Sequence, residues 1–244
     1  AAGGLAPPAW AQAVPEPTLP VAQPATDLSN DPDFLGGTRL FSAWLDHQVS
    51  YRGLPGVMVG VVHDQKLIWQ KGFGFADVKQ RLPMTAETKF RMASHSKMLT
   101  AIAVMQLREQ GKLRLDDPVV KHLPWFKGQP AGKDDAPITI EQLLSHRSGI
   151  GDYLDESLFD DITDFELPVP AQRLWSTEQY VPILDGHPRV AAPGAQFEYN
   201  NGGYVVLALV AERTAGQPFE VLVRERVCDR AGVGSTRSLR SDEL

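Results

Sequence analysis

Two neighbouring apolar runs constrain the fold of this chain more than any other feature of its sequence. Residues 56–62 and 66–75 are rich in Val, Ile and aromatic residues, and His63-Asp64-Gln65 joins them. Runs of this composition, separated by a short polar link, predict a β-hairpin. A lone two-stranded hairpin is barely stable in water, so it needs further strands or a covering helix.

Helices are predicted on both sides of the hairpin. Before it, apolar residues recur at helical spacing over residues 34–49, and a helix there can cover the strands. After it, the apolar period indicates a buried helix from Ser94 to about Gly111, and a short helix should begin at Pro118. The alternative source of cover is a set of strands beyond Leu244.

Capping patterns predict the starts of further helices. Thr139 with Gln142, and Ser176 with Gln179, have the spacing of a capping box. The other expected elements are helices over about 202–214, ended by Gly216, and over 219–228, together with an acidic surface loop over 149–170.

The composition is that of a globular protein with a substantial core. The chain has 244 residues, a formal net charge of -6 and 43% hydrophobic residues, which allows one large domain or two small ones. An acidic balance without basic runs argues against a nucleic-acid partner. The single cysteine, Cys228, excludes an intramolecular disulfide framework and is expected to be a buried apolar side chain. No run approaches the roughly 18 to 20 apolar residues that cross a bilayer.

Residues 1–32 are expected to be the remnant of a signal peptide followed by a Pro-rich leader. The chain begins without Met, and Ala9 and Ala11 resemble the small residues of a cleavage site, although a low-complexity linker is the alternative. The leader lacks the apolar residues that would offset its ordering entropy. We therefore expect an exported protein, periplasmic or secreted, whose folded domain covers 33–244.

The candidate nucleophile is Ser94, which Lys97 follows three residues later. On a helix this spacing places both side chains on one face, about 5 to 6 Å apart at Cβ. A serine hydroxyl becomes a useful nucleophile when a neighbouring base takes its proton, and a desolvated lysine can be that base. Alone the pattern is weak, because Ser94 can equally be an N-cap and Lys97 a solvated first-turn lysine.

The second candidate cluster is Tyr199-Asn200-Asn201, just before an apolar helix. A tyrosine and an amide two residues apart in a turn can point the same way, offering a proton relay and a hydrogen-bond donor. The structural alternative is a tyrosine that packs on the core with Asn201 capping the helix.

Together the two patterns resemble the serine β-lactamase and penicillin-binding superfamily. The branch is the one that contains class C β-lactamases, D-alanyl-D-alanine carboxypeptidases and family VIII esterases, since the second motif carries tyrosine where class A enzymes carry serine. The resemblance covers roughly Phe34 to Leu244. The matching segments are the nucleophile motif 90–97, the Tyr-x-Asn motif 199–201 and the connecting stretches 54–57, 110–119 and 138–150.

The resemblance implies an α/β fold in which an antiparallel sheet is flanked by helices, with a helical subdomain over about 94–215. It implies that Ser94 is acylated by an ester, amide or β-lactam carbonyl, that Lys97 helps to remove its proton, and that Tyr199 is base and proton relay. Asn201 would hydrogen-bond the substrate's amide. One oxyanion donor would be the Ser94 N–H. No metal or organic cofactor is implied, and the expected partner is a small-molecule or cell-wall peptide substrate of a monomer.

The chain departs from the family in one respect. The family's third motif, Lys or His followed by a small residue and Gly on a late strand, does not follow Asn201. We therefore expect the sheet to be incomplete here, and the chain to be the N-terminal part of a longer enzyme with little turnover by itself. The alternative function is a non-catalytic protein that binds or senses a ligand with the same fold.

Other candidate sites are weaker. His146 lies near Ser145 and Ser148, but a histidine that bonds the last carbonyls of a helix is the commoner arrangement. His95 can line a cleft or be exposed. Acidic residues over 152–164 could attract a cation, but a solvated loop face is the simpler explanation.

Overall fold

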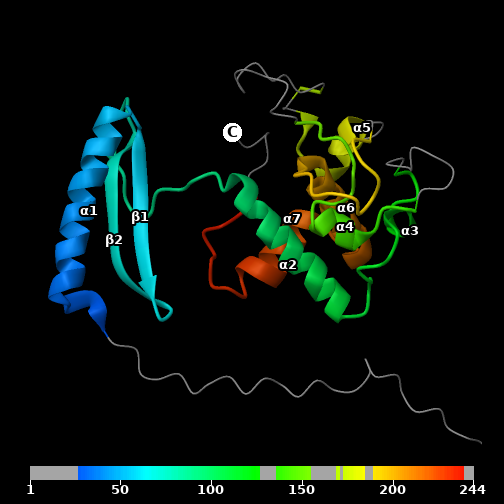
Figure 1. Cartoon of the computed structure of the whole chain (residues 1–244), viewed down its shortest axis with the longest axis horizontal. Helices are drawn as coiled ribbons and strands as arrows, with labels where there is room; N and C mark the ends of the chain where they lie inside the picture. The colour runs from blue at the N-terminus through cyan, green and yellow to red at the C-terminus, as the bar shows by residue number, and fades with distance from the viewer. Residues whose placement is uncertain (1–26, 127–135, 155–168, 171–172, 185–188, 239–244) are drawn as a thin grey trace, which may run out of the picture. The chain divides into compact units, whose positions relative to one another are not determined.

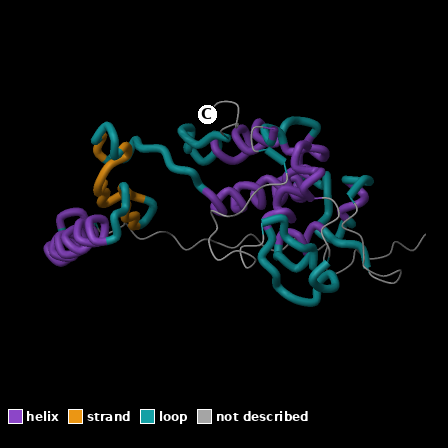
Figure 2. The backbone as a smooth tube through the Cα atoms, turned by 90° about the horizontal axis from the view of Figure 1, so that it is seen from above, coloured by secondary structure: helices purple, strands orange, loops and turns teal. Residues whose placement is uncertain are grey.

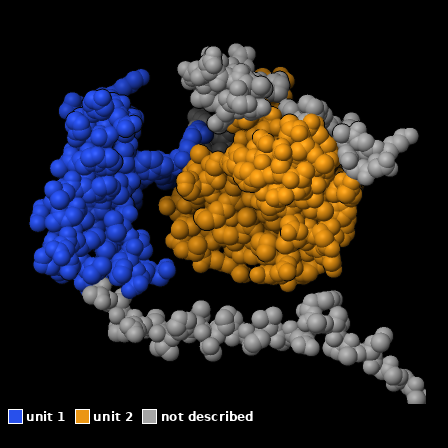
Figure 3. Space-filling model, viewed as in Figure 1, with its two compact units in different colours: residues 1–91 blue, residues 92–244 orange. Residues whose placement is uncertain are grey.

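The computed structural model describes residues 27–126, 136–154, 169–170, 173–184 and 189–238. The chain divides into two compact units, residues 1–91 and 92–244, coloured separately in Figure 3. The first unit holds the strands of the described part, and helices dominate the second. The predicted α/β class with an antiparallel sheet is confirmed. Most of the expected signal remnant and leader lies outside the described residues.

Helix α1 (Pro32–Tyr51) belongs to the first unit and packs against the hairpin, which is one of the sources of cover that the sequence left open. It begins where the Asp31 carboxylate accepts a hydrogen bond from the backbone N–H of Phe34. The Phe41 ring lies 6.3 Å from the ring of Trp69 on the neighbouring strand. Figures 1 and 2 show the helix alongside the strands. Phe41 is still 40% exposed, so the contact between these rings covers the hairpin only in part.

The sheet has three antiparallel strands in the order β1-β2-β3. β1 (Gly56–His63) and β2 (Lys66–Asp77) are the predicted hairpin, and Asp64 and Gln65 form its turn with φ values of 46° and 64°. Two consecutive residues with positive φ match the right-handed twist of the strands. The third strand, β3 (Leu82–Pro83), was not predicted, because two residues are too short to show an alternating pattern.

Two glycines let β2 and its neighbours approach closely. A Cβ on Gly72 would lie 2.1 Å from the backbone oxygen of Met84, and Gly74 has φ of 70°. Phe73 between them is only 2% exposed. These two positions therefore need glycine so that the backbone of β2 can lie close to its neighbours.

The second unit consists of helices joined by irregular segments. Its α-helices are α2 (Ser96–Glu109), α3 (Val119–His122), α4 (Ile140–Leu144), α5 (Val181–Leu184), α6 (Asn201–Ala215) and α7 (Phe219–Val223). The predicted capping box at α4 is present: the Thr139 hydroxyl accepts from the Gln142 N–H, and the Gln142 side chain accepts from the Thr139 N–H. Helix α6 ends at Gly216 in the left-handed conformation, as expected.

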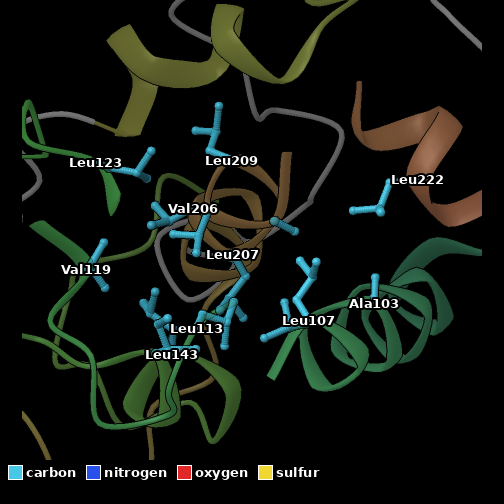
Figure 4. Packing of buried hydrophobic residues seen from close by; sticks show 14 of the residues in the cluster. Ala103, Leu107, Leu113, Val119, Leu123, Leu143, Val206, Leu207, Leu209 and Leu222 are labelled. Atoms are coloured by element: carbon cyan, nitrogen blue, oxygen red, sulfur yellow. The ribbon is translucent and has the colours of Figure 1, made fainter. Parts of the chain in front are cut away.

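The core of the second unit is built around α6. Eight of its fifteen residues are buried, so the helix is apolar on nearly all sides. Figure 4 shows Val206 and Leu207 of α6 among Leu107 of α2, Leu143 of α4 and Leu222 of α7. Because α6 is held from several directions, the residues at its N-terminus have fixed positions.

The last predicted helix changes its geometry part of the way along. After α7 the chain continues as a π-helical turn over Arg224–Cys228, in which Cys228 is buried as expected. Within the described residues, no helix is long and apolar enough to cross a bilayer.

Candidate active site

Ser94 lies in a tight turn that leads into α2. A 3-10 turn spans Ala93–His95 and the α-helix begins at Ser96, so the expected helix start at Ser94 is wrong by two residues. The reason is local: the His95 N–H bonds to the Met92 carbonyl and the Ser96 N–H to the Ala93 carbonyl, which is the pattern of a 3-10 turn, and Ala93 has a left-handed φ of 45°. Such backbone strain is often found where a functional side chain must be oriented.

Two side chains converge on the Ser94 hydroxyl. Lys97 Nζ donates a hydrogen bond to Ser94 Oγ over 3.3 Å, and the Tyr199 hydroxyl is hydrogen-bonded to the same oxygen at 2.7 Å. The helical spacing of the first pair was predicted from the sequence. The second pair joins the turn before α2 to the segment that precedes α6.

The pKa of Tyr199 is shifted in the opposite direction from the pKa values of Tyr153 and Tyr180. Partial burial by itself would raise the pKa of Tyr199, but hydrogen bonds with Lys97 and Ser94 and the charge of Lys97 outweigh burial and lower the pKa. Burial raises the pKa of Tyr153 to about 12 and also raises the pKa of Tyr180. Tyr199 is therefore the phenol best suited to exchange a proton with Ser94.

Asn201 forms a second side-chain hydrogen bond with Lys97. Its Oδ1 accepts a hydrogen bond from Lys97 Nζ at 2.8 Å. The cap of α6 is Asn200, whose Oδ1 accepts from the Gly203 N–H at 2.6 Å, so the alternative role of Asn201 as a helix cap is wrong. The capping residue thus leaves the side chain of Asn201 free to reach the lysine.

The carboxylate of Asp152 binds the same end of α6. It accepts hydrogen bonds from the Asn201 N–H at 2.9 Å, the Asn201 Nδ2 at 2.8 Å and the Gly202 N–H at 3.0 Å. The carboxylate of Asp152 therefore satisfies backbone N–H groups at the N-terminus of α6. The other residues of the acidic run, 155–164, lie outside the described residues.

His146 packs beneath Tyr199. Its ring is stacked on the Tyr199 ring with centroids 4.5 Å apart, and lies 4.9 Å from the ring of Tyr204. Its Nδ1 accepts a hydrogen bond from the Asn200 N–H at 3.1 Å. Among the described residues the ring is hydrogen-bonded to this N–H and to no helix carbonyl, so the expected side-chain bond to helix carbonyls is wrong.

His146 is not paired with a serine in the described part of the chain. Burial is the main cause that lowers the pKa of His146, and the nearby charge of Lys97 lowers it further. The hydroxyl of Ser145 donates to the Glu141 carbonyl instead. His95, the other histidine considered, is exposed, with Nδ1 3.1 Å from the Met92 carbonyl oxygen.

A cavity of about 820 Å³ opens at the serine. Aromatic and aliphatic side chains form much of its wall, and two arginines, Arg224 and Arg237, lie along it. The residues that line it include Ser94, Lys97, Tyr199 and Asn201 together with Tyr153, Leu174, Trp175, Tyr180, Tyr204 and Phe219. A concave, largely apolar site with a few convergent polar groups is typical of a small-molecule binding site.

The four residues predicted from the sequence thus lie together in one cavity, and two neighbours were not predicted as site residues. His146 falls inside a stretch that carries the family resemblance, which could have indicated its place. Asp152 was interpreted as one of several solvated acidic residues. In the described part of the chain, no group of three or more His, Cys, Asp or Glu residues could hold a metal ion.

The fold and the site together define the class of protein. A solved penicillin-binding protein homologue from Pyrococcus abyssi, described as octameric, matches with a TM-score of 0.70 and 31% identity over 80% of this chain and 43% of its own. EstCE1, described as a hydrolase with promiscuous acyltransferase activity, has a TM-score of 0.64 and 31% identity over 78% and 50%. A D-amino acid amidase from Ochrobactrum anthropi SV3 has a TM-score of 0.61 and 25% identity over 76% and 47%.

The family model described as Beta-lactamase matches residues 41–242, and the chain belongs to this family. Among curated proteins, Protein flp of Staphylococcus aureus is 31% identical over 72% of this chain and 33% of its own length. Esterase EstB of Burkholderia gladioli is 33% identical over 78% and 49%. The chain therefore spans a third to a half of the length of these relatives.

Proposed function

We propose that this chain carries the nucleophile, the base and the positioning groups of a serine hydrolase that forms an acyl-enzyme on Ser94. The observation that carries the proposal is the convergence on one hydroxyl: Tyr199 at 2.7 Å and Lys97 at 3.3 Å from Ser94 Oγ. A nucleophile within hydrogen-bond reach of a base that a third group orients is the arrangement that covalent catalysis needs. Membership of the β-lactamase family, with an esterase and an amidase among its relatives, supports a hydrolase.

The first half-reaction transfers the acyl group to the serine. Ser94 Oγ attacks the carbonyl carbon while its proton moves to the Tyr199 phenolate, which Lys97 stabilises by its charge. The Ser94 N–H is proposed as one donor to the oxygen that becomes negative. When the tetrahedral intermediate collapses, the bond to the leaving group breaks and Tyr199 returns the proton to the departing oxygen or nitrogen.

The second half-reaction releases the acyl group. Water attacks the ester carbon of acyl-Ser94, Tyr199 accepts a proton from that water, and Ser94 Oγ leaves with the proton restored to it. Asn201 is proposed to hold Lys97 in place and to offer its second amide hydrogen to a substrate amide. Each proton is returned within a cycle, so the residues end as they began.

The substrate class remains a proposal that covers esters, amides and β-lactams. The apolar wall of the cavity favours an acyl group that is at least partly hydrophobic. A panel of chromogenic esters, a chromogenic cephalosporin and a D-amino acid amide would separate these classes. Because the chain spans only part of its relatives, the panel should use the longest form of the protein that its coding sequence provides.

The decisive comparison uses two serine variants. Ser94→Ala should abolish turnover of every substrate, whereas Ser145→Ala should leave it unchanged, because Ser145 is exposed and its hydroxyl donates to the Glu141 carbonyl. If Ser94→Ala binds substrate as tightly as the wild type and the wild type never turns it over, the protein is a binding or sensor protein instead.

Two further expectations are proposals of the same kind. Export to the periplasm or the medium follows from the signal-like N-terminus and is tested by locating the protein in fractionated cells. The expected monomer is tested by light scattering, and the octameric homologue from Pyrococcus abyssi makes a larger assembly the alternative outcome.

A further inference from the structure

We propose that Asp152 is a positioning residue that fixes Lys97 against Ser94, acting through the side-chain amide of Asn201. The inference rests on the proposed acyl-transfer function of the site. Asp152 does not reach the serine; it acts through hydrogen bonds that link one carboxylate, one amide and one ammonium group.

The chemistry of the three groups allows only one arrangement. A carboxylate is an acceptor and an ammonium is a donor, whereas an amide has one end of each kind. Asn201 lies between them, with Nδ2 2.8 Å from Asp152 and Oδ1 2.8 Å from Lys97. If the side-chain amide of Asn201 were flipped, its NH2 donor would face the ammonium and its oxygen acceptor would face the carboxylate. Asp152 therefore determines that an oxygen faces the lysine.

The carboxylate is itself held firmly. It also accepts from the backbone N–H groups of Asn201 and Gly202 at the start of α6, a helix whose buried residues fix its position. Hydrogen bonds to an ionised acceptor are roughly twice as strong as neutral ones. The link from Asp152 to Lys97 thus has a rigid anchor at one end.

The charge of Asp152 also reaches the proposed base. The titratable groups that face Tyr199 are Lys97 on α2, Asp152 and His146 on the segment after α4, and Tyr204 on α6. The charge of Lys97 lowers the pKa of Tyr199, and the charge of Asp152 raises it. Without the carboxylate, Lys97 loses its fixed place beside the phenol. The hydrogen bond and charge of Lys97 lower the pKa of Tyr199 more than the charge of Asp152 raises it, so this pKa should rise.

The test measures how fast a fluorophosphonate probe labels Ser94 as a function of pH. Asp152→Asn should label about tenfold to a hundredfold more slowly at its optimum, and the midpoint of its pH profile should move to higher pH. Asp152→Glu keeps the charge but displaces it, so it should also label more slowly, with a midpoint moved to higher pH because Lys97 is no longer held in place. Asp116→Asn is the matched control, because it removes an exposed carboxylate that pairs only with Arg114 among described residues.

A second comparison tests the route through the amide. Asn201→Ala breaks the link at its middle, so the double variant with Asp152→Asn should label no more slowly than the slower single variant. Additive losses would overturn the proposed route. If Asp152→Asn does not fold by circular dichroism, Asp152→Glu decides the matter, and a wild-type rate in that variant overturns the inference.

The outcomes separate this inference from the function on which it rests. Wild-type rate and midpoint in folded Asp152→Asn would overturn the role of Asp152 while labelled Ser94 upholds the hydrolase. A loss of rate without a shifted midpoint would mean that Asp152 only supports the fold. An unlabelled wild type would overturn the function itself.

Discussion

The Tyr199 hydroxyl lies 2.7 Å from Ser94 Oγ, although 105 positions separate the two residues in the chain. Helix α6 makes this contact possible, because its buried residues fix the segment that carries Tyr199 against α2. The pair connects the fold to the chemistry: the core places a phenol of lowered pKa beside a serine.

Removal of the phenol oxygen should slow acylation far more than it weakens the fold. Tyr199→Phe keeps the stacked ring but loses the base, so the rate of fluorophosphonate labelling should fall by about 10²- to 10³-fold. Tyr51→Phe is the control, since that side chain is 77% exposed in the first unit. Equal labelling of Tyr199→Phe and wild type would show that another group accepts the proton.

The acylation rate should rise with pH through the pKa of Tyr199. The phenolate is the form that accepts a proton, so the rate is low below this pKa and reaches a plateau above it. Because the pKa is lowered, the midpoint should lie below the ordinary tyrosine value of about 10. Stopped-flow labelling across pH measures the midpoint, and the same rise in Tyr199→Phe would assign it to a different group.

Acid should weaken the fold through Asp117. Burial alone would raise the pKa of this carboxyl, but hydrogen bonds from Lys121, the Arg114 N–H and His122 outweigh burial and lower it from 3.8 to about 2. The folded pKa lies below the unfolded one, so the stabilisation is complete above about pH 4 and is lost as the pH falls towards 2. The loss should be about 2 kcal/mol.

Urea unfolding followed by circular dichroism at pH 7 and near pH 2 measures this loss. Other carboxyl groups also titrate there, so the informative quantity is the difference between wild type and Asp117→Asn. The variant should be less stable at pH 7, because Lys121 and His122 lose their charged partner. An identical acid-induced loss in both proteins would contradict the role of Asp117.

Gly72→Ala should destabilise the first unit. The new Cβ would meet the Met84 oxygen at 2.1 Å, so the strand must shift, at a cost of about 1–3 kcal/mol. Gly37→Ala is the matched control in α1, where nothing lies within 4 Å; it should be neutral or stabilising by up to about 1 kcal/mol. Thermal unfolding compares the two, and equal melting temperatures would contradict the close approach.

Local geometry explains why part of the site could be predicted from the sequence. Ser94 and Lys97 are three residues apart, so helical periodicity alone brings them together. Their meeting with Tyr199 depends on tertiary packing, and only the family resemblance indicated it. The two-residue strand β3 and the 3-10 turn at Ala93 were missed, since neither has a repeating pattern from which it could be recognised.

The position of Asp152 could not be predicted for a different reason. It stands at the beginning of an acidic run, and composition alone makes such residues look solvated. Its hydrogen bonds to Asn201 and Gly202 arise from the approach of two segments about 50 positions apart. Charge patterns describe a sequence locally, whereas this contact is made between distant segments.

The most direct test of the central claim is the mass of the intact protein after brief incubation with a fluorescent penicillin or a fluorophosphonate, followed by peptide mapping. We expect the addition of one probe molecule, located on Ser94, that disappears in Ser94→Ala and persists in Ser145→Ala. A probe located on another residue, or folded wild-type protein that takes up neither probe, would contradict it.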